Sequence, residues 1–516
     1  MWEVVLAACL VLFTAFYFYV KYYKMSFWRR RGIPEDPGFF PFGGQFVWDL
    51  IMQRIGFTEM VKTVYRNHGN EKVVGTYEVL GNPSVLIRDL DIAKLVLIKD
   101  FDQFMERKPS YSVPFNFETV NNTYIPRMLV ELRGKEWKQL RTSLTPAFTS
   151  GKLKSMVSLI HKVVDNCHTF LDTKSEDDSN MEDLMRDYAM DVIVSTGFGY
   201  DCDSFNQPDN IFKKQADKLF GKDMNWKTTL SYMMFFFMPK VLGWLDWPFL
   251  DKHAEEFFSE LIKKTISERQ ESGEKRNDFI DICLEILTKE EKVLETGEER
   301  RMNREELDKI LIANSLMMFL AGLETLTNVG SLIMYFMATN EDCQEKLHKE
   351  LKEAADKKGD VNFDYTTIMN LPYLEKVFQE SQRMYPMGPL ERASVNEYTI
   401  PGTNITIPKD IYVRIPVGAI VKDAKYFPDP EVFNPDNFDA EKKAARHSLA
   451  SGGFGHGPRN CIAQRFATME VKILVARILH KYHVLRCEKT VDHLVPDTTS
   501  TSFLPKGGTW IAFQMR

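Results

Sequence analysis

The stretch from Phe454 to Cys461 places one cysteine at the end of a glycine-rich turn. It reads Phe-Gly-His-Gly-Pro-Arg-Asn-Cys, and from Ile462 to Leu485 apolar residues recur at three- and four-residue spacing, which predicts a helix. Cys461 then lies near the N-terminus of that helix. The unpaired backbone N–H groups and the helix dipole there are expected to lower the pKa of the cysteine. The pattern therefore predicts a thiolate held at a defined place in the fold.

The other residues of this loop suit a flat ligand that carries carboxylates. Gly455 and Gly457 let the backbone approach such a ligand closely, and Arg459 offers a donor fork to a carboxylate. A thiolate, close-approach glycines and such an arginine are what a haem with a cysteine axial ligand requires. The alternative is a buried structural cysteine after a tight turn, which the eight-residue pattern makes the weaker interpretation.

The loop resembles the haem-binding loop of the cytochrome P450 family. Phe454, Gly457, Arg459 and Cys461 stand at the family's spacing, whereas Ala463 replaces a glycine that is commoner there. Further matching motifs follow in order from the N-terminus to the C-terminus. The resemblance implies heme b (iron protoporphyrin IX) as cofactor, Cys461 as the only protein ligand of the iron, and the cytochrome P450 fold. The stretch 144–154 resembles more narrowly the animal xenobiotic-oxidising and insect detoxification enzymes.

Composition excludes several other classes of protein. The chain has 516 residues, of which 44% are hydrophobic and 27% charged, as in an ordinary globular protein with a large core. A net charge of −6 gives no indication of nucleic-acid binding. The seven cysteines are scattered and no pair has C-x-x-C spacing, so neither a disulfide framework nor a zinc site is predicted. This usage favours a reduced, cytosol-facing compartment.

The N-terminus is predicted to anchor the chain in a membrane. Val4 to Val20 is a run of 17 residues without a charge, with Trp2 before it and an aromatic cluster at its end. Basic residues follow the run, and only Glu3 precedes it, so the positive-inside rule places the body in the cytosol. A cleaved signal peptide would need a basic segment before the run and a small-residue cleavage site after it, and both are missing.

We expect three segments: a transmembrane anchor at 1–20, a basic and proline-rich hinge at 21–44, and the haem-thiolate monooxygenase domain at 45–516. The resemblance implies that the membrane is the endoplasmic reticulum (microsomal) membrane. Within the body, periodicity predicts one large, mainly α domain with a minor β-sheet. The predicted helices are 135–147, 155–172, 180–197, 254–271, 304–338, 340–357, 373–384 and 462–481. The predicted strands are 72–77, 83–88, 397–407, 411–415 and 508–514.

Ala321-Gly-Leu-Glu-Thr325 lies inside the long apolar helix predicted at 304–338. Two small residues in mid-helix indicate that something approaches the backbone there, and an acid with an alcohol can pass protons into an apolar pocket. The alternative is a helix packed tightly on a neighbour. The resemblance places Ala321 over the haem and gives Glu324 and Thr325 the catalytic proton-delivery role. Leu326 stands where the family often has a second alcohol.

Charged residues elsewhere match family positions for holding the cofactor and bracing the fold. The resemblance implies that four residues contact the haem propionates: Trp137, Arg141, Arg392 and Arg459. Cations are expected there, because the two negative charges of the propionates must be paired when they are buried in protein. It also implies a buried structural pair, Glu380 and Arg383, whose usual third member is an arginine. Asn437 takes that place, which leaves Glu380 short of one charged donor. We therefore expect Asn437→Arg to raise the temperature at which haem is lost. The alternative is that the added arginine is a buried unpaired charge and destabilises the fold.

The substrate region is indicated by apolar residues. The block Met233–Met238 has adaptable side chains and, by resemblance, roofs the pocket and touches the bilayer. The resemblance also places four residues at the pocket lining: Phe115, Phe117, Leu320 and Phe503. Apolar lining of this kind fits xenobiotics, steroids and fatty acids alike.

The resemblance implies a monooxygenase that inserts one oxygen atom of dioxygen into an apolar small molecule. Electrons would come from NADPH through NADPH-cytochrome P450 reductase, with cytochrome b5 as a second candidate partner. Lys135, Lys138, Arg465 and Lys472 are candidates for pairing with an acidic reductase. Two alternatives remain: a haem-thiolate peroxide isomerase or dehydratase, and a haem-binding sensor without turnover.

Overall fold

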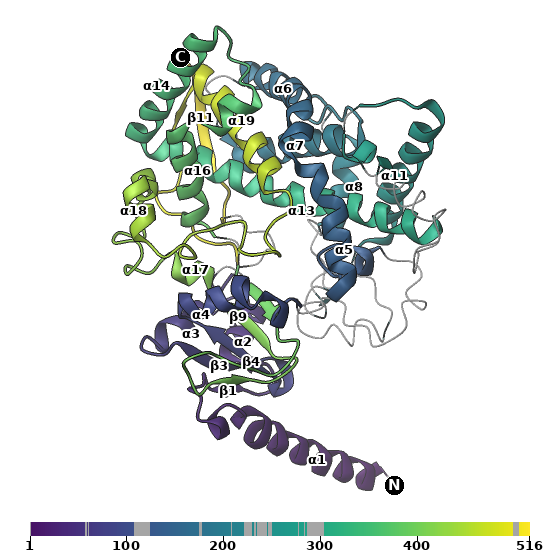
Figure 1. Cartoon of the computed structure of the whole chain (residues 1–516), viewed down its shortest axis with the longest axis vertical. Coiled ribbons are helices and arrows are strands. Elements are labelled where there is room, and N and C mark those ends of the chain that lie inside the picture. Colours follow the sequence, from purple (N-terminus) through teal and green to yellow (C-terminus); the bar gives the residue numbers. More distant parts are fainter. Residues whose placement is uncertain are drawn as a thin grey trace.

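The computed structural model places a helical body above a small sheet region, and helix α1 (Trp2–Phe18) projects from the sheet end (Figure 1). The structure describes residues 2–56, 59, 61–107, 124–174, 178–207, 209–220, 230–231, 234, 245, 250–276, 278–282, 284–285, 304–386, 388–498 and 505–516. The prediction of a mainly α fold with a minor β-sheet is confirmed.

The helical body is organised around α13 (Arg304–Thr339), which runs through its centre (Figure 1). Its long apolar sequence is accommodated because neighbouring helices cover it on most sides, as expected for a helix that is hydrophobic all round. The other longer helices are α5 (Gly134–Leu144), α6 (Ser150–Thr173), α7 (Met181–Ile193), α8 (Ile211–Leu219), α11 (Lys252–Ser272), α14 (Glu341–Lys358), α16 (Pro372–Met384) and α19 (Gln464–Lys481).

Helix ends follow local capping chemistry. The Asp251 side chain accepts a hydrogen bond from Ala254 N at 3.0 Å at the start of α11, and Gly273 closes that helix with a φ of 67°. At α16, Pro372 stands in the first turn and the Glu350 carboxylate accepts the free N–H groups of Tyr373 and Leu374. These caps explain why the sequence periodicity locates the helices well.

The main sheet has four strands in the order β3-β4-β9-β6. Strand β3 pairs with β4, and β9 with β6, in antiparallel orientation. Strand β4 runs parallel to β9, with Val85 opposite Val413. A second sheet has the order β10-β11-β5. The strands are β3 (Val73–Tyr77), β4 (Pro83–Ile87), β9 (Tyr412–Ile415), β6 (Leu390–Ala393), β10 (Tyr482–Leu485), β11 (Trp510–Met515) and β5 (Ser179–Asn180).

Two predicted elements differ in kind over part of their length. The helix predicted at 462–481 begins at Gln464 and ends at Lys481, so the continuation of the helical pattern to Leu485 is wrong, because Tyr482–Leu485 pairs with the last strand as β10. The strand expected over 397–407 is a short hairpin of β7 (Tyr398–Thr399) and β8 (Thr406–Ile407). Neither difference changes the fold class.

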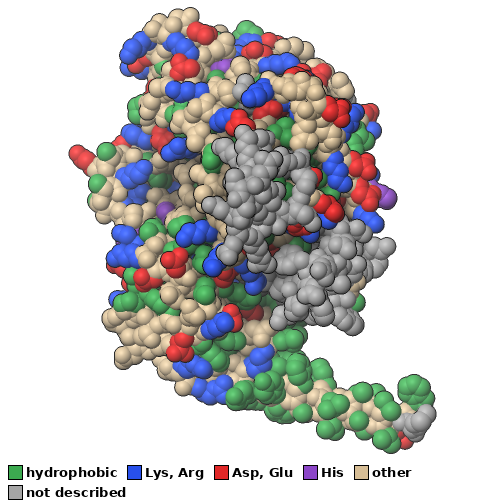
Figure 2. Space-filling view, turned by 45° about the vertical axis from the view of Figure 1, so that its right-hand side comes forward, with side chains coloured by type: hydrophobic (Ala, Val, Ile, Leu, Met, Phe, Trp, Pro, Cys, Tyr) green, Lys and Arg blue, Asp and Glu red, His purple; other side chains and the backbone are tan. Residues whose placement is uncertain are grey.

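The segment expected to form a hinge, 21–44, packs against the four-stranded sheet. Trp28 is fully buried, and its Nε1 donates to Thr76 O at 3.1 Å. Val20, Met25 and Ile33 are buried in the same hydrophobic cluster as the sheet. Helix α1 itself has no buried residue and presents hydrophobic side chains along the face seen in Figure 2. The helical stretch Trp2–Arg31, of which α1 is the first part, is long and apolar enough to cross a membrane.

Candidate functional site

The loop from Phe454 to Cys461 is a tight turn closed by a hydrogen bond from Cys461 N to Phe454 O at 2.8 Å. Gly455 and Gly457 both have a φ of 74°, in the left-handed region that favours glycine. A Cβ on Gly457 would lie 1.8 Å from Leu97 O. Gly457 is therefore required by an approaching segment of the protein itself, whereas the sequence had suggested a ligand.

Cys461 is exposed at the end of this turn, although Arg459 beside it is buried. The surrounding protein nevertheless keeps much of the nearby solvent away from the Cys461 thiol, and this burial raises its pKa. The effect outweighs the lowering of the pKa by the Ala463 N–H, Arg141 and Arg107. The expected lowering of this pKa by the helix terminus is therefore wrong: α19 begins three residues later, and burial dominates. A metal ion bound to the sulfur would itself remove the proton.

Arg459 is packed against the residue predicted to share its role. Its guanidinium lies 4.1 Å from the centre of the Trp137 ring, and it donates to Met105 O and Leu132 O at 3.1 and 2.8 Å. Nη1 has no hydrogen-bond partner among the described residues. Burial, with Arg107 close by, lowers the pKa of Arg459 to about 9.

Arg392 reaches the same place from strand β6. It is 1% exposed, and its Nη1 and Nη2 donate to backbone oxygens of Glu391 and His456. Its Nε has no partner in the described part of the chain. Burial lowers the pKa of Arg392 to about 9, and repulsion from Arg107 and Arg459 adds to the effect.

Arg141 and Arg107 complete the group. Arg141, on α5, donates to the backbone and side-chain oxygens of Asn460 at 2.8 and 3.0 Å. Arg107 donates to Arg459 O at 3.0 Å, and burial lowers its pKa. Sequence reasoning missed Arg107, since no motif marks it and it is 352 positions from its partner.

These four arginines form a cluster of cations, of which Arg392 and Arg459 are buried and the other two half-buried, and two of their N–H groups have no partner among the described residues. The exposed cysteine lies beside them. Burying that much positive charge is costly unless an anion pairs with it. The two carboxylates of a haem would supply such an anion, and the Cys461 sulfur would be available to hold its iron. The residues present therefore fit the cofactor that the sequence predicts.

The predicted catalytic pair lies on α13. Thr325 Oγ1 donates to Ala321 O at 2.8 Å, and Ala321 is exposed. The Glu324 carboxylate is bound by Arg186 of α7, which also contacts Asp217 at 2.9 Å. No hydrogen bond or ion pair among the described residues joins this group to the arginine cluster.

Gly322 supports the packing alternative that the sequence left open. A Cβ there would lie 2.8 Å from Ile193 Cδ1, so a close approach of α7 requires this glycine. Ala321, one position earlier, instead faces accessible space. Gly322 thus allows α7 to pack closely on α13, whereas Ala321 borders accessible space.

Most of the predicted substrate contacts lie outside the described residues. Phe115, Phe117 and Phe503 belong to that part, as do Met233 and all of 235–238. Leu320 is half-buried on α13, beside Ala321, and Met234 is buried.

Glu380 and Arg383 form the predicted buried pair on α16. Arg383 Nε and Nη2 donate to the two carboxylate oxygens at 2.7 and 2.8 Å, and both side chains are almost fully buried. Asn437 Nδ2 donates to Glu380 Oε1 at 3.1 Å. The structure therefore brings together all three residues that the sequence assigned to this brace.

One of the cations expected to face a reductase is misassigned. Lys472 is fully buried and paired with Glu375, so it is not available to a docking partner. The sequence could not show this, because Lys472 lies within α19, where several polar residues are buried along with the apolar ones. Lys135, Lys138 and Arg465 are exposed.

Comparison with known proteins identifies relatives along the whole chain. The family model "Cytochrome P450" matches residues 38–512. "Cytochrome P450 6B7" of Helicoverpa armigera is 33% identical over 514 residues, covering 98% of each chain. "Cytochrome P450 6a2" of Drosophila melanogaster is 32% identical over 496 residues, covering 94% of each chain. "Cytochrome P450 6A1" of Musca domestica is 29% identical and covers 96% of this chain and 95% of its own length.

Proposed function

The chain belongs to the cytochrome P450 family and is a P450 monooxygenase, and on that basis we propose that it oxidises an apolar small molecule from a membrane-bound position. The observation that carries the proposal is the cluster of Arg107, Arg141, Arg392 and Arg459 around Cys461, with two buried N–H groups unpartnered. The substrate class is a xenobiotic, steroid or fatty acid. The electrons come from NADPH through a reductase, with cytochrome b5 as a second donor.

Each residue of the site has a defined task in this proposal. The haem, when bound, supplies the activation of dioxygen. The Cys461 sulfur holds its iron, and the arginines orient its carboxylates while Trp137 supports Arg459 through ring contact. Thr325 holds a proton on Oγ1, which its bond to Ala321 O orients.

Glu324 is the proposed source of replacement protons. Its carboxylate is bound to Arg186, so it must turn from that guanidinium before it can exchange protons with the space beside Ala321. Asp217 shares Arg186 at 2.9 Å and offers the guanidinium an alternative anion during that movement. Glu324 can therefore donate a proton only after its carboxylate has left Arg186.

The location follows from the N-terminal segment. We assign 1–20 to the anchor, 21–44 to the connecting segment and 45–516 to the catalytic domain, with the endoplasmic reticulum as the membrane. Exposed apolar side chains along α1 and the basic residues after it support a cytosolic domain. The exposed Lys135, Lys138 and Arg465 are the cations proposed to pair with the reductase.

The test compares the protein with Cys461→Ser and, as a matched control, Cys343→Ser, which changes another accessible free cysteine. The parent and the control should show the red-shifted Soret band of the reduced carbonyl complex, and Cys461→Ser should lack it. Substrate-stimulated NADPH consumption with added reductase separates a monooxygenase from a peroxide isomerase, a dehydratase or a sensor. A Cys461→Ser protein that keeps the red-shifted band would disprove the assignment.

A further inference from the structure

Glu106 lies between two of the elements that carry the arginine cluster. It precedes Arg107 in the sequence, and its backbone forms an isolated antiparallel bridge with Ala393, the residue after Arg392. Ala393 N donates to Glu106 O at 2.7 Å. The backbone of Glu106 is thereby tied to strand β6.

The side chain of Glu106 reaches the N-terminus of α5. Gly134, the first residue of α5, has a φ of 50°, and the side chain of the preceding Arg133 does not cap the helix. The Gly134 N–H is one of the donors that a helix leaves without a partner of its own. Glu106 Oε1 accepts this N–H at 2.9 Å. Because the helix dipole also favours a carboxylate at this end, Glu106 caps α5 from 28 positions away.

Helix α5 carries two of the predicted haem contacts, Trp137 and Arg141, about one and two turns after the cap. The centre of the Trp137 ring lies 4.1 Å from the Arg459 guanidinium. Arg141 donates to the backbone and side-chain oxygens of Asn460 in the cysteine loop, at 2.8 and 3.0 Å. The placement of the first turn of α5 therefore determines where both side chains lie.

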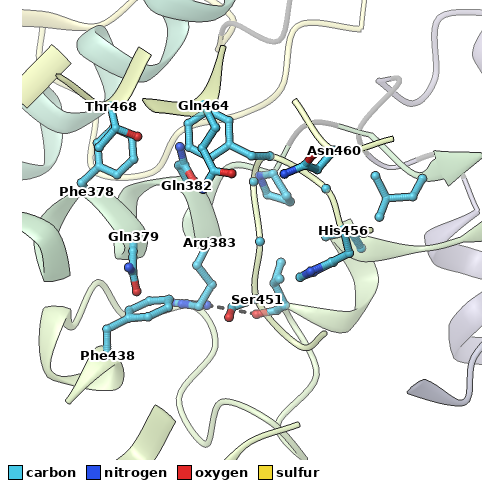
Figure 3. A pocket seen from close by; sticks show the side chains of 18 of the residues that line it. Phe378, Gln379, Gln382, Arg383, Phe438, Ser451, His456, Asn460, Gln464 and Thr468 are labelled. Carbon is cyan, nitrogen blue, oxygen red and sulfur yellow. Dashed lines mark hydrogen bonds between the residues drawn. The ribbon is translucent and has the colours of Figure 1, made fainter. Parts of the chain in front are cut away.

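Strand β6 contacts the same loop at another residue. Arg392 Nη2 donates to His456 O at 3.4 Å. Figure 3 shows His456 and Asn460, which Arg392 and Arg141 bind, on one stretch of this loop. The contacts form a closed ring that runs from the loop through α5 to Glu106, and from Glu106 through β6 back to the loop. Glu106 is the member of this ring that touches both α5 and β6.

Glu106 also contributes a negative charge to the cluster. Burial and Arg107 lower the pKa of Arg459, and the Glu106 carboxylate opposes them. Glu106 Oε2 and Arg459 Nη1 are both buried without a hydrogen-bond partner among the described residues, so the two side chains are not bonded to each other. The hydrogen bond to Gly134 is therefore the direct link between the Glu106 side chain and the elements of the site.

We propose that Glu106 is a positioning residue of the haem site, which acts through its hydrogen bond to Gly134 N and thereby places α5 against the haem carboxylates. The inference rests on the proposed function, since it requires that the arginine cluster binds a haem. Glu106 acts on the cofactor through α5, whereas the arginines bind its carboxylates themselves.

The test measures the transfer of haem from the loaded full-length protein to an excess of apomyoglobin. Glu106→Ala should transfer haem about tenfold faster than the parent, because α5 loses a hydrogen bond to a charged acceptor. Glu106→Gln keeps an oxygen at the same reach and should stay within about threefold of the parent. Glu136→Ala is the matched control, because it removes another acid from the first turn of α5, at an exposed position, and should not change the rate.

A double-mutant cycle with Arg141→Gln separates positioning of α5 from a general loss of stability. If Glu106 acts through α5, Glu106→Ala should accelerate haem transfer only about threefold in the Arg141→Gln background. An equal acceleration in both backgrounds would overturn the proposal. The same holds if Glu106→Gln is as fast as Glu106→Ala, which would assign the effect to charge, or if Glu136→Ala is as fast.

Glu106→Asp keeps the charge but shortens the reach, and it replaces Glu106→Ala if that variant does not fold. Haem transfer should then be faster from Glu106→Asp than from Glu106→Gln, and the reverse order would overturn the proposal. The reduced carbonyl spectrum of each loaded protein reports separately on Cys461. A parent without the red-shifted band would disprove the haem-thiolate assignment, whereas unchanged transfer rates with the band present would disprove only the role of Glu106.

Discussion

Asn437 Nδ2 donates to Glu380 Oε1 at 3.1 Å, joining positions 57 apart in the sequence. The same oxygen accepts Asn434 N and Arg383 Nη2, each at 2.8 Å. Glu380 therefore has more donors than the sequence had suggested.

Arg446 brings a second cation to this brace. Its Nη2 donates to Asn437 O at 2.7 Å, and its guanidinium lies 3.8 Å from the centre of the Phe427 ring. Burial lowers the pKa of Arg446, while Glu380 raises it. The positive charge expected at position 437 thus approaches Glu380 from position 446.

Asn437→Arg should therefore lower the temperature at which haem is lost, because a third guanidinium would be buried beside Arg383 and Arg446. A scan that follows the Soret band measures this, and a shift corresponding to about 1–3 kcal/mol is expected. In an Arg446→Gln background, Asn437→Arg should lower this temperature less, or should raise it. A single variant with a higher transition would contradict the expectation.

Arg107→Gln should weaken haem retention, since Arg107 adds positive charge to the buried cluster around Arg392 and Arg459. Transfer of haem to an excess of apomyoglobin should be about tenfold faster than from the parent. Arg133→Gln, at an exposed position, is the control and should not change the rate. Equal rates of haem transfer from all three proteins would show that Arg107 does not help to hold the haem.

Deletion of residues 2–18 should leave a haem-loaded body, because no residue of α1 is buried. Deletion of 2–32 should destabilise the body strongly, because it removes the fully buried Trp28; truncating such a side chain alone typically costs about 3–5 kcal/mol. The two deletions are compared by the temperature of Soret loss. Similar transitions would show that Trp28 does not contribute to the fold.

Thr325→Ala should keep haem and substrate binding but release more hydrogen peroxide per NADPH consumed. Among the described residues its Oγ1 donates only to carbonyls of its own helix, at Ala321 and Gly322, so we expect the fold not to depend on it. Thr327→Ala is a matched control, since Thr327 makes the same kind of bond, to Leu323 O, from a buried position. If Thr325→Ala releases no more hydrogen peroxide per NADPH than the parent, Thr325 is a packing residue without a role in proton delivery.

Asp191→Asn should change how stability depends on pH. Burial raises the pKa of Asp191 to about 6, so the folded protein binds a proton that the unfolded chain releases near pH 4. This carboxyl therefore makes stability fall as pH rises from about 4 to 6, by up to about 1.4 kcal/mol per pH unit. His168, whose pKa burial lowers to about 4, has the opposite effect in the same range.

The measurement for Asp191 is consequently the difference between the variant and the parent. Urea midpoints at pH 4.5 and 6.5 should fall less, or rise more, with pH in Asp191→Asn. Asp102→Asn, at an exposed position, is the control. Parallel pH profiles for Asp191→Asn and the parent would contradict the assignment.

The sequence alone predicted the fold class, most helices and the cysteine loop. Those features depend on local patterns: apolar periodicity, capping residues, and a run of eight residues around Cys461. It also predicted Trp137, Arg392 and Arg459 as one group, and the structure brings them together.

Only the tertiary structure decided which charges meet. Arg107 joins the cysteine loop, Arg186 holds Glu324, Arg446 approaches Glu380, and Lys472 is buried against Glu375. Each of these partners lies far away along the chain, and the residue types carry no signal of the pairing. Burial explains why they pair at all, because a charge removed from water must find an opposite charge or a donor, and the packing of distant elements determines which one is within reach.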